Sequence, residues 1–290
     1  METKPACHQC FLRQASDAAK RLNLSAARTD ELLATAQAQL QQPSASATPP
    51  IIASDLHAMI RHESGCSDPY LAAKQSATEH ALSLYPKLKQ LLADADDPLD
   101  TAIRLAIAGN IIDLGVADAY DLEASIERVI KLTPAINHLP ELREALSHAE
   151  QVLYLADNAG ETVLDRLLIE QLELPVTYVV KGGATVNDAT RDDALAAGLD
   201  QACEIIDNGA ASMGTLLERC SAEFRNRFDR AELIIAKGMA NFESLSGSRS
   251  GLFFLLQAKC GVVADHLSVA EKSIIILQDQ AETAEAETGV

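Results

Sequence analysis

The chain has 290 residues, of which 48% are hydrophobic and 23% are charged, a composition typical of globular proteins. Its 42 acidic side chains outnumber the 24 basic ones, which gives a formal net charge of −18. This balance argues against a nucleic-acid-binding protein, because the phosphate backbone is held by an excess of Lys and Arg. An anionic ligand therefore needs a local cation.

The amino-terminal residues include no apolar stretch of signal-peptide length, and no later run approaches the roughly 18 apolar residues of a membrane span. We therefore expect a soluble, cytoplasmic protein that binds neither membrane nor nucleic acid. Its cysteines are too sparse for a disulfide scaffold, so we expect reduced thiols, with the last three in the core. They are Cys7, Cys10, Cys66, Cys203, Cys220 and Cys260.

From Phe11 to about Lys131 the sequence predicts helices, because Ala, Leu, Gln, Glu and Lys dominate and apolar residues recur three and four positions apart. Residues 41–50 (QQPSASATPP) interrupt this pattern. We predict an exposed loop there, since Pro49 and Pro50 cannot continue a helix. Residues 1–149 are thus predicted to form a helical N-terminal domain.

After residue 150 the pattern changes to short apolar runs, each followed by turn residues and then by a helical pattern. The predicted strands are 152–156, 176–180, 204–206, 233–236, 253–256 and 274–277. Short apolar strands that alternate with helices indicate a parallel sheet covered on both faces. We therefore predict an α/β protein, with a Rossmann-like α/β/α domain and a mainly parallel sheet over residues 150–277. Residues 278–290 are polar and acidic and are predicted to form a disordered tail.

Polar side chains follow the predicted strands, at the sheet edge where open α/β sheets bind their ligands. Asp157 and Asn158 follow the first strand and Asp188 follows the second. Three such oxygen donors suit Mg, Mn or a similar ion that keeps positions open for water or phosphate, whereas no His and Cys pair lies nearby for catalytic zinc. Taken alone, Asp157 and Asn158 are better explained as caps of the next helix.

Lys237 ends a later strand and precedes Gly238. A lysine charge beside backbone amides suits a phosphate of which another oxygen is held by a metal ion. In isolation, an exposed lysine after a strand is the simpler explanation. The combination with three oxygen donors at the same edge favours a phosphate site.

Two further groups leave alternatives open. Asn110 and Asp113 lie three positions apart, so a helix would place both on one face, toward an interdomain cleft or at a helix end before Gly115. Cys7 and Cys10 form a CxxC, which His62 and Cys66 could complete as a zinc cluster. Packed or redox-active thiols are the favoured alternative for this CxxC.

Seven segments occur in order along the chain: CHQC at 7–10, GCSDPY at 65–70, AGNIIDLG at 108–115, DNAGE at 157–161, VNDAT at 186–190, NGAASMGTLLERCSAEF at 208–224 and IAKGMANFESL at 235–245. Together they resemble the DUF89 family, the damage-control phosphatases with the ARMT1-like domain. The first three resemble its prokaryotic-type subfamily, which carries an N-terminal CxxC. The similarity extends over residues 5–277.

This resemblance implies a metal-dependent phosphomonoesterase that hydrolyses small damaged or side-product phosphometabolites, such as sugar phosphates or phosphopantetheine-like compounds, with Mn, Co, Ni or Mg. It implies that Asp157, Asn158 and Asp188 bind the metal and that Lys237 contacts the phosphate. The substrate-binding or supporting residues that it implies are Glu161, Asn241, Glu243, Asn110 and Asp113. Near Ala211 the chain lacks an acidic residue expected in many relatives, which leaves open whether it shares their substrate preference.

The sequence leaves open whether an ordered water or the Asp157 carboxylate attacks phosphorus. The alternative functions are a carboxylate methyltransferase and a non-catalytic protein that binds a phosphometabolite. A methyltransferase would need a glycine-rich nucleotide-binding loop after the first strand, but residues 157–161 contain a single glycine. No sequence feature indicates the oligomeric state.

Overall fold

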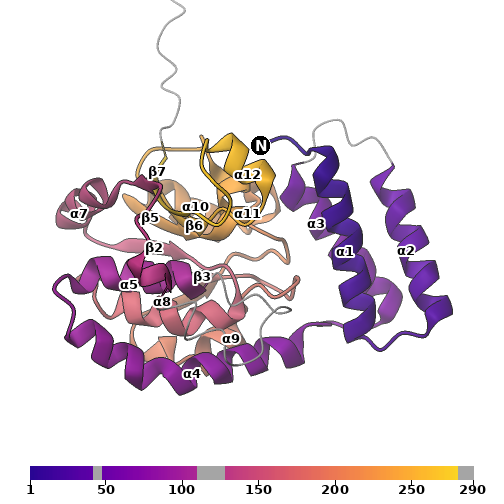
Figure 1. The fold of residues 1–290 in the computed structure, drawn as a ribbon, viewed down its shortest axis with the longest axis horizontal. Coiled ribbons are helices and arrows are strands. Elements are labelled where there is room, and N and C mark those ends of the chain that lie inside the picture. Colours follow the sequence, from indigo (N-terminus) through magenta and orange to yellow (C-terminus); the bar gives the residue numbers. More distant parts are fainter. Residues whose placement is uncertain (42–47, 110–127, 280–290) are drawn as a thin grey trace, which may run out of the picture.

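The computed structural model describes residues 1–41, 48–109 and 128–279. Asn110 and Asp113, and residues 280–290 of the predicted tail, lie outside this part. A seven-stranded sheet in the order β1-β7-β6-β5-β2-β3-β4 forms the centre (Figure 1). Its strands are β1 (Ile136–Asn137), β2 (Val152–Leu155), β3 (Val176–Val180), β4 (Glu204–Asp207), β5 (Leu233–Lys237), β6 (Leu252–Gln257) and β7 (Ile274–Gln278).

The predicted α/β fold with a mainly parallel sheet is confirmed, since every pair of neighbouring strands is parallel except β6 and β7. β1 was not predicted. It pairs with β7 over two residues at the edge of the sheet, and so short a strand has no periodicity that a sequence pattern can reveal.

Helices cover both faces of the sheet, because alternate strand residues point to opposite sides (Figure 1). One face carries α4 (Leu71–Ala93), α5 (Pro98–Gly109), α7 (Leu139–His148), α8 (Thr162–Ile169) and α9 (Arg191–Ala196). The other carries α10 (Ala222–Arg230), α11 (Gly238–Leu245) and α12 (Gly261–His266). Short 3-10 turns are η1 (Ala159–Glu161), η2 (Leu199–Gln201) and η3 (Leu217–Arg219).

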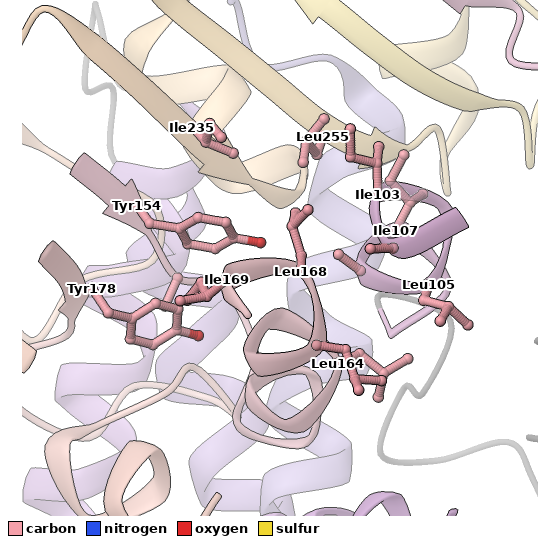
Figure 2. Close-up of a cluster of buried hydrophobic side chains, with 14 of the residues drawn as sticks. Ile103, Leu105, Ile107, Tyr154, Leu164, Leu168, Ile169, Tyr178, Ile235 and Leu255 are labelled. Carbon is pink, nitrogen blue, oxygen red and sulfur yellow. The ribbon is translucent and has the colours of Figure 1, made fainter. Parts of the chain in front are cut away.

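Figure 2 shows the core on the first face, where side chains of α5 and α8 meet those of the sheet. Tyr154, Ile235 and Leu255 come from three neighbouring strands and are at most 1% exposed. Ile103 and Leu168 pack onto them from the helices. The two tyrosines of this core, Tyr154 and Tyr178, donate their hydroxyl hydrogens to Asp165 of α8, so the layer also holds a buried carboxylate.

Three helices, α1 (Pro5–Arg21), α2 (Ala26–Leu40) and α3 (Pro49–Ser64), stand beside the sheet and share a separate core (Figure 1). Two side chains from loops of the α/β part, Val186 and Met213, pack against it. The boundary at residue 149 stays a prediction. In the packing, α4, α5 and α7 contribute to the core on the sheet, whereas α1–α3 have their own.

The loop predicted over residues 41–50 extends two residues too far. Helix α3 begins at Pro49, and both Pro49 and Pro50 are buried in its first turn. Proline is tolerated there because the first turn makes no use of those N–H groups. The two prolines therefore start a helix that we expected them to exclude.

All six cysteines are free thiols. The expectation that the last three lie in the core holds for Cys220, which is buried, but is wrong for Cys260, which is exposed at the N-cap of α12. Cys203 is half-buried. Within the part of the chain that the structure covers, no helix has the length and apolar character needed to cross a bilayer.

Candidate active site at the carboxyl edge of the sheet

The predicted site residues lie where the strand order reverses. From β2 the chain passes to β3 and β4 on one side, and it later returns to β5 and β6 on the other. At such a switch point the connections leave in opposite directions and open a crevice at the carboxyl ends of the strands. Asp157 follows β2 and Lys237 ends the neighbouring β5.

Main-chain hydrogen bonds bring the three predicted metal ligands together. Asn158 and Asp188 form an isolated antiparallel bridge. Ala189 N donates to Asp157 O at 2.8 Å, and Ala159 N donates to Asn187 O at 2.8 Å. Because these bonds join the loops after β2 and β3, residues about thirty positions apart meet side by side. Asp157, Asn158 and Asp188 are 7%, 9% and 2% exposed, respectively.

The side chains leave oxygen atoms available for a cation. Asn158 Nδ2 donates to Glu161 Oε1 at 2.6 Å and to Asp157 Oδ2 at 3.3 Å, so its amide oxygen faces away from those carboxylates. Asp188 Oδ2 is buried and, among the residues described, accepts no hydrogen bond; Lys181 Nζ lies 3.4 Å from it. Burial raises the pKa of Asp188, although the charge of Lys181 opposes this shift.

Gly238 makes room for the Asp157 carboxylate. A Cβ atom at this position would lie 1.9 Å from Asp157 Oδ2, and the residue has φ of +79°. Only glycine adopts such a backbone without strain and also leaves this space open. The glycine after Lys237 is therefore required by the position of Asp157.

Lys237 is fully buried and contacts two carboxylates. Its Nζ donates to Glu161 Oε2 at 3.0 Å and to Asp165 Oδ1 at 2.6 Å. Burial acts to lower the pKa of Lys237, but Asp165 and Glu161 outweigh it and raise the pKa above its ordinary value. Burial likewise raises the pKa of Glu161, against the charge of Lys237. The predicted contact of Lys237 with phosphate stays a prediction.

Asn241 holds the surrounding main chain. Its Nδ2 donates to Ala156 O at 3.1 Å and to Lys237 O at 2.7 Å, and its Oδ1 accepts a hydrogen bond from Thr215 Oγ1 at 2.8 Å. The amide thus joins the ends of β2 and β5 to the loop after β4. We assign it a supporting position, one of the two roles left open by the sequence.

Glu243 lies one helical turn beyond the start of α11 and is half-buried. Burial raises its pKa to about 7, and the negative charge of Asp157 adds to the shift. The structure therefore places a carboxyl group that ionises near neutral pH within electrostatic range of Asp157.

Two buried side chains of the site were not predicted. Lys181 directly follows β3, and its Nζ donates to Gly214 O at 2.5 Å while facing Asp188. A cavity of about 150 Å³ lies beside it, lined in part by Gly182, Gly183 and Arg191. Asp165 is the second, and its spacing of four from Glu161 was the available sequence signal, since such residues share one helix face.

Helix α4 anchors the loop that carries Asp188. Lys74 is 1% exposed and its Nζ lies 2.8 Å from Asp193 Oδ2 and 2.9 Å from Asp68 Oδ2. Asp193 Oδ2 also accepts hydrogen bonds from Thr190 N and Oγ1, at 2.9 and 2.6 Å. The aspartate of the GCSDPY segment therefore acts through Lys74, and Tyr70 of that segment is buried in the core of α1–α3.

The possible zinc cluster is not formed in the structure. Cys7, Cys10, His62 and Cys66 all lie in described segments, and across those segments no three His, Cys, Asp or Glu side chains group as ligands of a metal ion. The set formed by Asp157, Asn158 and Asp188 contains two carboxylates and one amide, a donor set of the oxygen-rich kind that Mg and Mn prefer.

Comparisons with known proteins agree with this architecture. Residues 3–275 match the damage-control phosphatase ARMT1-like domain. The chain is 36% identical to a damage-control phosphatase of Pyrococcus horikoshii, over 74% of this chain and 76% of the relative, and 36% identical to one of Archaeoglobus fulgidus, over 75% and 78%. An uncharacterized protein of Methanocaldococcus jannaschii is 32% identical over 96% of both chains.

A crystal structure of a DUF89 family protein from Pyrococcus horikoshii superposes with a TM-score of 0.89 at 30% identity, covering 97% of this chain and all of that one. Sequence and fold thus agree over nearly the whole length. The chain belongs to the DUF89 family, the damage-control phosphatases.

Proposed function

We propose that this protein is a metal-dependent phosphomonoesterase that hydrolyses small phosphorylated metabolites, damaged or formed as side products, such as sugar phosphates or phosphopantetheine-like compounds. The observation that carries the proposal is the Asp188 Oδ2 atom, buried without a hydrogen bond from the described residues, beside Asp157 and Asn158. Burying a carboxylate oxygen without a close hydrogen bond is costly; Lys181 Nζ, 3.4 Å from this atom, offsets part of the cost, and a bound divalent cation would offset more of it.

The residues fit a divalent ion. Asp157, Asn158 and Asp188 supply three oxygen donors, and the absence of a side chain at Gly238 gives the Asp157 carboxylate its place. They would hold Mn, Co, Ni or Mg, which when bound polarises a phosphoryl group and offsets its negative charge. The phosphate of a substrate would lie at this edge of the sheet, and the cavity beside Lys181 is the opening that the structure shows there.

The protein's own cations support the same assignment. Lys181 lies beside Asp188, and Lys237 lies one strand away, behind Glu161. Together they limit the repulsion that buried carboxylates would otherwise exert on an incoming phosphate. We keep Lys237 as a candidate phosphate contact; its two present contacts leave the third N–H of the ammonium for that role.

Asp157 has two possible roles in the reaction. It either orients a water for attack or attacks phosphorus itself to give an aspartyl phosphate. The first leaves no covalent intermediate, whereas the second is trapped by acid quenching with a labelled substrate. Glu161, Asn241 and Glu243 are proposed to support or contact the substrate, together with Asn110 and Asp113, which lie outside the described residues. The cytoplasmic location stays a prediction from the sequence.

Hydrolysis of para-nitrophenyl phosphate tests this function. We expect phosphate release by the chelator-treated protein to require added Mn, Co, Ni or Mg. Asp157→Ala and Asp188→Asn should remove it while the variants stay folded. No metal-stimulated release by the wild type, or undiminished release by Asp157→Ala, would show that the assignment is wrong.

The same assay separates the alternatives. If the protein only binds phosphometabolites, these ligands would raise its Tm, but no phosphate would be released. A carboxylate methyltransferase would release none and would bind S-adenosylmethionine. A panel of phosphorylated metabolites, assayed with the most active metal, then identifies the substrate class.

A further inference from the structure

A fully buried carboxylate lies beneath the proposed metal ligands and binds none of them directly. Asp165 is 0% exposed on α8. Its Oδ1 accepts hydrogen bonds from Tyr154 OH at 2.8 Å and from Lys237 Nζ at 2.6 Å, and its Oδ2 accepts one from Tyr178 OH at 2.8 Å. Both oxygen atoms are therefore fixed.

The register of the sheet produces this arrangement. Tyr154 on β2 lies opposite Tyr178 on β3 in the parallel pairing, and the rings stack with centroids 5.4 Å apart. Their hydroxyl groups point the same way, toward α8 (Figure 2). Burial, followed by the charge of Asp165, raises the pKa of both tyrosines, so both stay neutral donors.

Contacts continue from Asp165 to a proposed metal ligand. Lys237 donates to Asp165 on one side and to Glu161 Oε2 on the other. The second oxygen of Glu161, Oε1, accepts the hydrogen bond from Asn158 Nδ2 at 2.6 Å. Tyrosines, Asp165, Lys237, Glu161 and Asn158 thus form one continuous buried chain of hydrogen bonds.

The orientation of the Asn158 amide depends on this chain. The nitrogen and oxygen of a carboxamide are nearly equal in size, so packing alone does not distinguish the two orientations. Acceptors opposite Nδ2 do, because carboxylates repel the amide oxygen; Glu161 Oε1 at 2.6 Å forms the shorter of the two hydrogen bonds, and Asp157 Oδ2 at 3.3 Å forms the longer one. With Nδ2 facing Glu161, Oδ1 is the atom presented to a cation.

We propose that Asp165, Tyr154 and Tyr178 are positioning residues for the metal site, acting through Lys237 and Glu161 to keep the Asn158 oxygen facing the ion. The inference rests on the proposed function, in that Asn158 is taken as a ligand. In this arrangement the charge of Lys237 is shared between two carboxylates, and the two tyrosines prevent Asp165 from shifting.

Mn²⁺ binding to the folded, chelator-treated protein tests this proposal. Free Mn²⁺ is measured by electron paramagnetic resonance during titration of the wild type, Tyr154→Phe, Tyr178→Phe, Asp165→Asn and the double Tyr→Phe variant. Removing outer partners of metal ligands costs roughly 10–100-fold in metal affinity, and we expect Asp165→Asn and the double variant to fall in that range. Each single Tyr→Phe variant should show a smaller loss.

Tyr85→Phe is the matched control. Tyr85 OH also donates to a carboxylate, Glu170 Oε1 at 2.6 Å, which in turn accepts hydrogen bonds from Arg166 and Lys89. This group lies at the other end of α8 from Glu161. Its loss should change stability without changing Mn²⁺ affinity. At saturating Mn²⁺ the kcat of Tyr178→Phe should return toward wild type, because the ligand is misoriented but still present.

The outcomes separate this inference from the function on which it rests. If the wild type binds Mn²⁺ and the folded variants bind it equally well, the inference is overturned and the proposed function is left intact. Equal losses in Tyr85→Phe and Tyr178→Phe would also overturn it, since they would indicate general destabilisation. Wild type without Mn²⁺ binding would overturn both. Thermal unfolding of each metal-free variant shows that the compared proteins are folded.

Discussion

At the scale of single residues, Gly238 controls where the Asp157 carboxylate lies. We expect Gly238→Ala to displace this carboxylate, because the added Cβ would lie 1.9 Å from its Oδ2. A misplacement of about 1 Å in a catalytic group costs on the order of 100-fold in rate, which sets the expected loss of metal-dependent phosphatase activity.

Gly247→Ala is the control for this change. Gly247 also has φ of +79°, but its added Cβ would have no neighbour within 4 Å. Both variants should lose roughly 1–2 kcal/mol of stability from the positive φ. Only Gly238→Ala should also lose phosphatase activity. Equal activities at a temperature where both are folded would show that Asp157 does not depend on this glycine. Denaturant unfolding and initial rates provide the two measurements.

At the scale of helices, α4 stabilises the Asp188 loop through the buried ammonium of Lys74. Removing one partner of a buried ion pair costs about 3–5 kcal/mol, since the other charges stay buried and unpaired. We expect this loss in Lys74→Met, together with faster native-state hydrogen exchange in residues 185–193. The expected increase includes Val186, which lies within this segment, holds φ of +43° and packs against α1–α3.

Lys89→Met on the same helix provides the comparison. Lys89 pairs with Glu170 at 3.0 Å, but its side chain is 60% exposed. A solvent-exposed pair contributes roughly 0–1 kcal/mol, so this variant should stay close to wild type in stability and exchange. Similar exchange of residues 185–193 in both variants would mean that Lys74 does not hold the loop.

Helix α3 gives the molecule a pH dependence through His57. Burial, followed by the charge of Arg61, lowers the pKa of His57 from 6.5 to about 3. The folded protein keeps this side chain neutral, whereas the unfolded chain takes up a proton below pH 6.5. The stability linked to His57 is thus fully present above pH 6.5 and is lost as the pH falls toward 3. Between pH 8 and 5 the loss is about 2 kcal/mol.

His57→Gln should remove this contribution, so that the variant loses less stability than wild type on acidification. His62→Gln, on the same helix and with an 85% exposed side chain, is the control and should behave like wild type. Urea unfolding from pH 8 to 5 measures all three. Parallel pH profiles for wild type and His57→Gln would contradict the prediction.

At the scale of the whole molecule, the net charge of −18 predicts two separate effects of added cations. Any salt screens the acidic surface. A divalent ion that binds the folded state also stabilises it by mass action, by about 2.7 kcal/mol at a concentration 100-fold above Kd. We therefore expect Mn²⁺ to raise Tm more than NaCl of equal ionic strength. This excess should disappear in Asp157→Ala, and its persistence there would place the bound ion elsewhere.

Much of the fold follows from the sequence alone. Short apolar runs such as 233–236 predicted β5, and polar residues directly after the runs predicted the sheet edge that holds Asp157, Asn158 and Asp188. These features are local, because burial on both faces leaves its mark on consecutive residues. Pro49 shows the limit of such patterns, because the residue types around a proline do not distinguish the end of one helix from the start of the next.

Tertiary structure alone decided which charges meet. Lys237 pairs with Glu161 and Asp165, which are 76 and 72 positions away, because β5 lies beside β2. Lys74 pairs with Asp193, 119 positions away, because α4 crosses to α9. Residue type determines that a side chain carries a charge, whereas its burial and its counter-charge depend on strand order and helix packing, which no short stretch of sequence contains. The sequence therefore predicted the oxygen donors of the proposed metal site, and only the fold decided how those side chains are held.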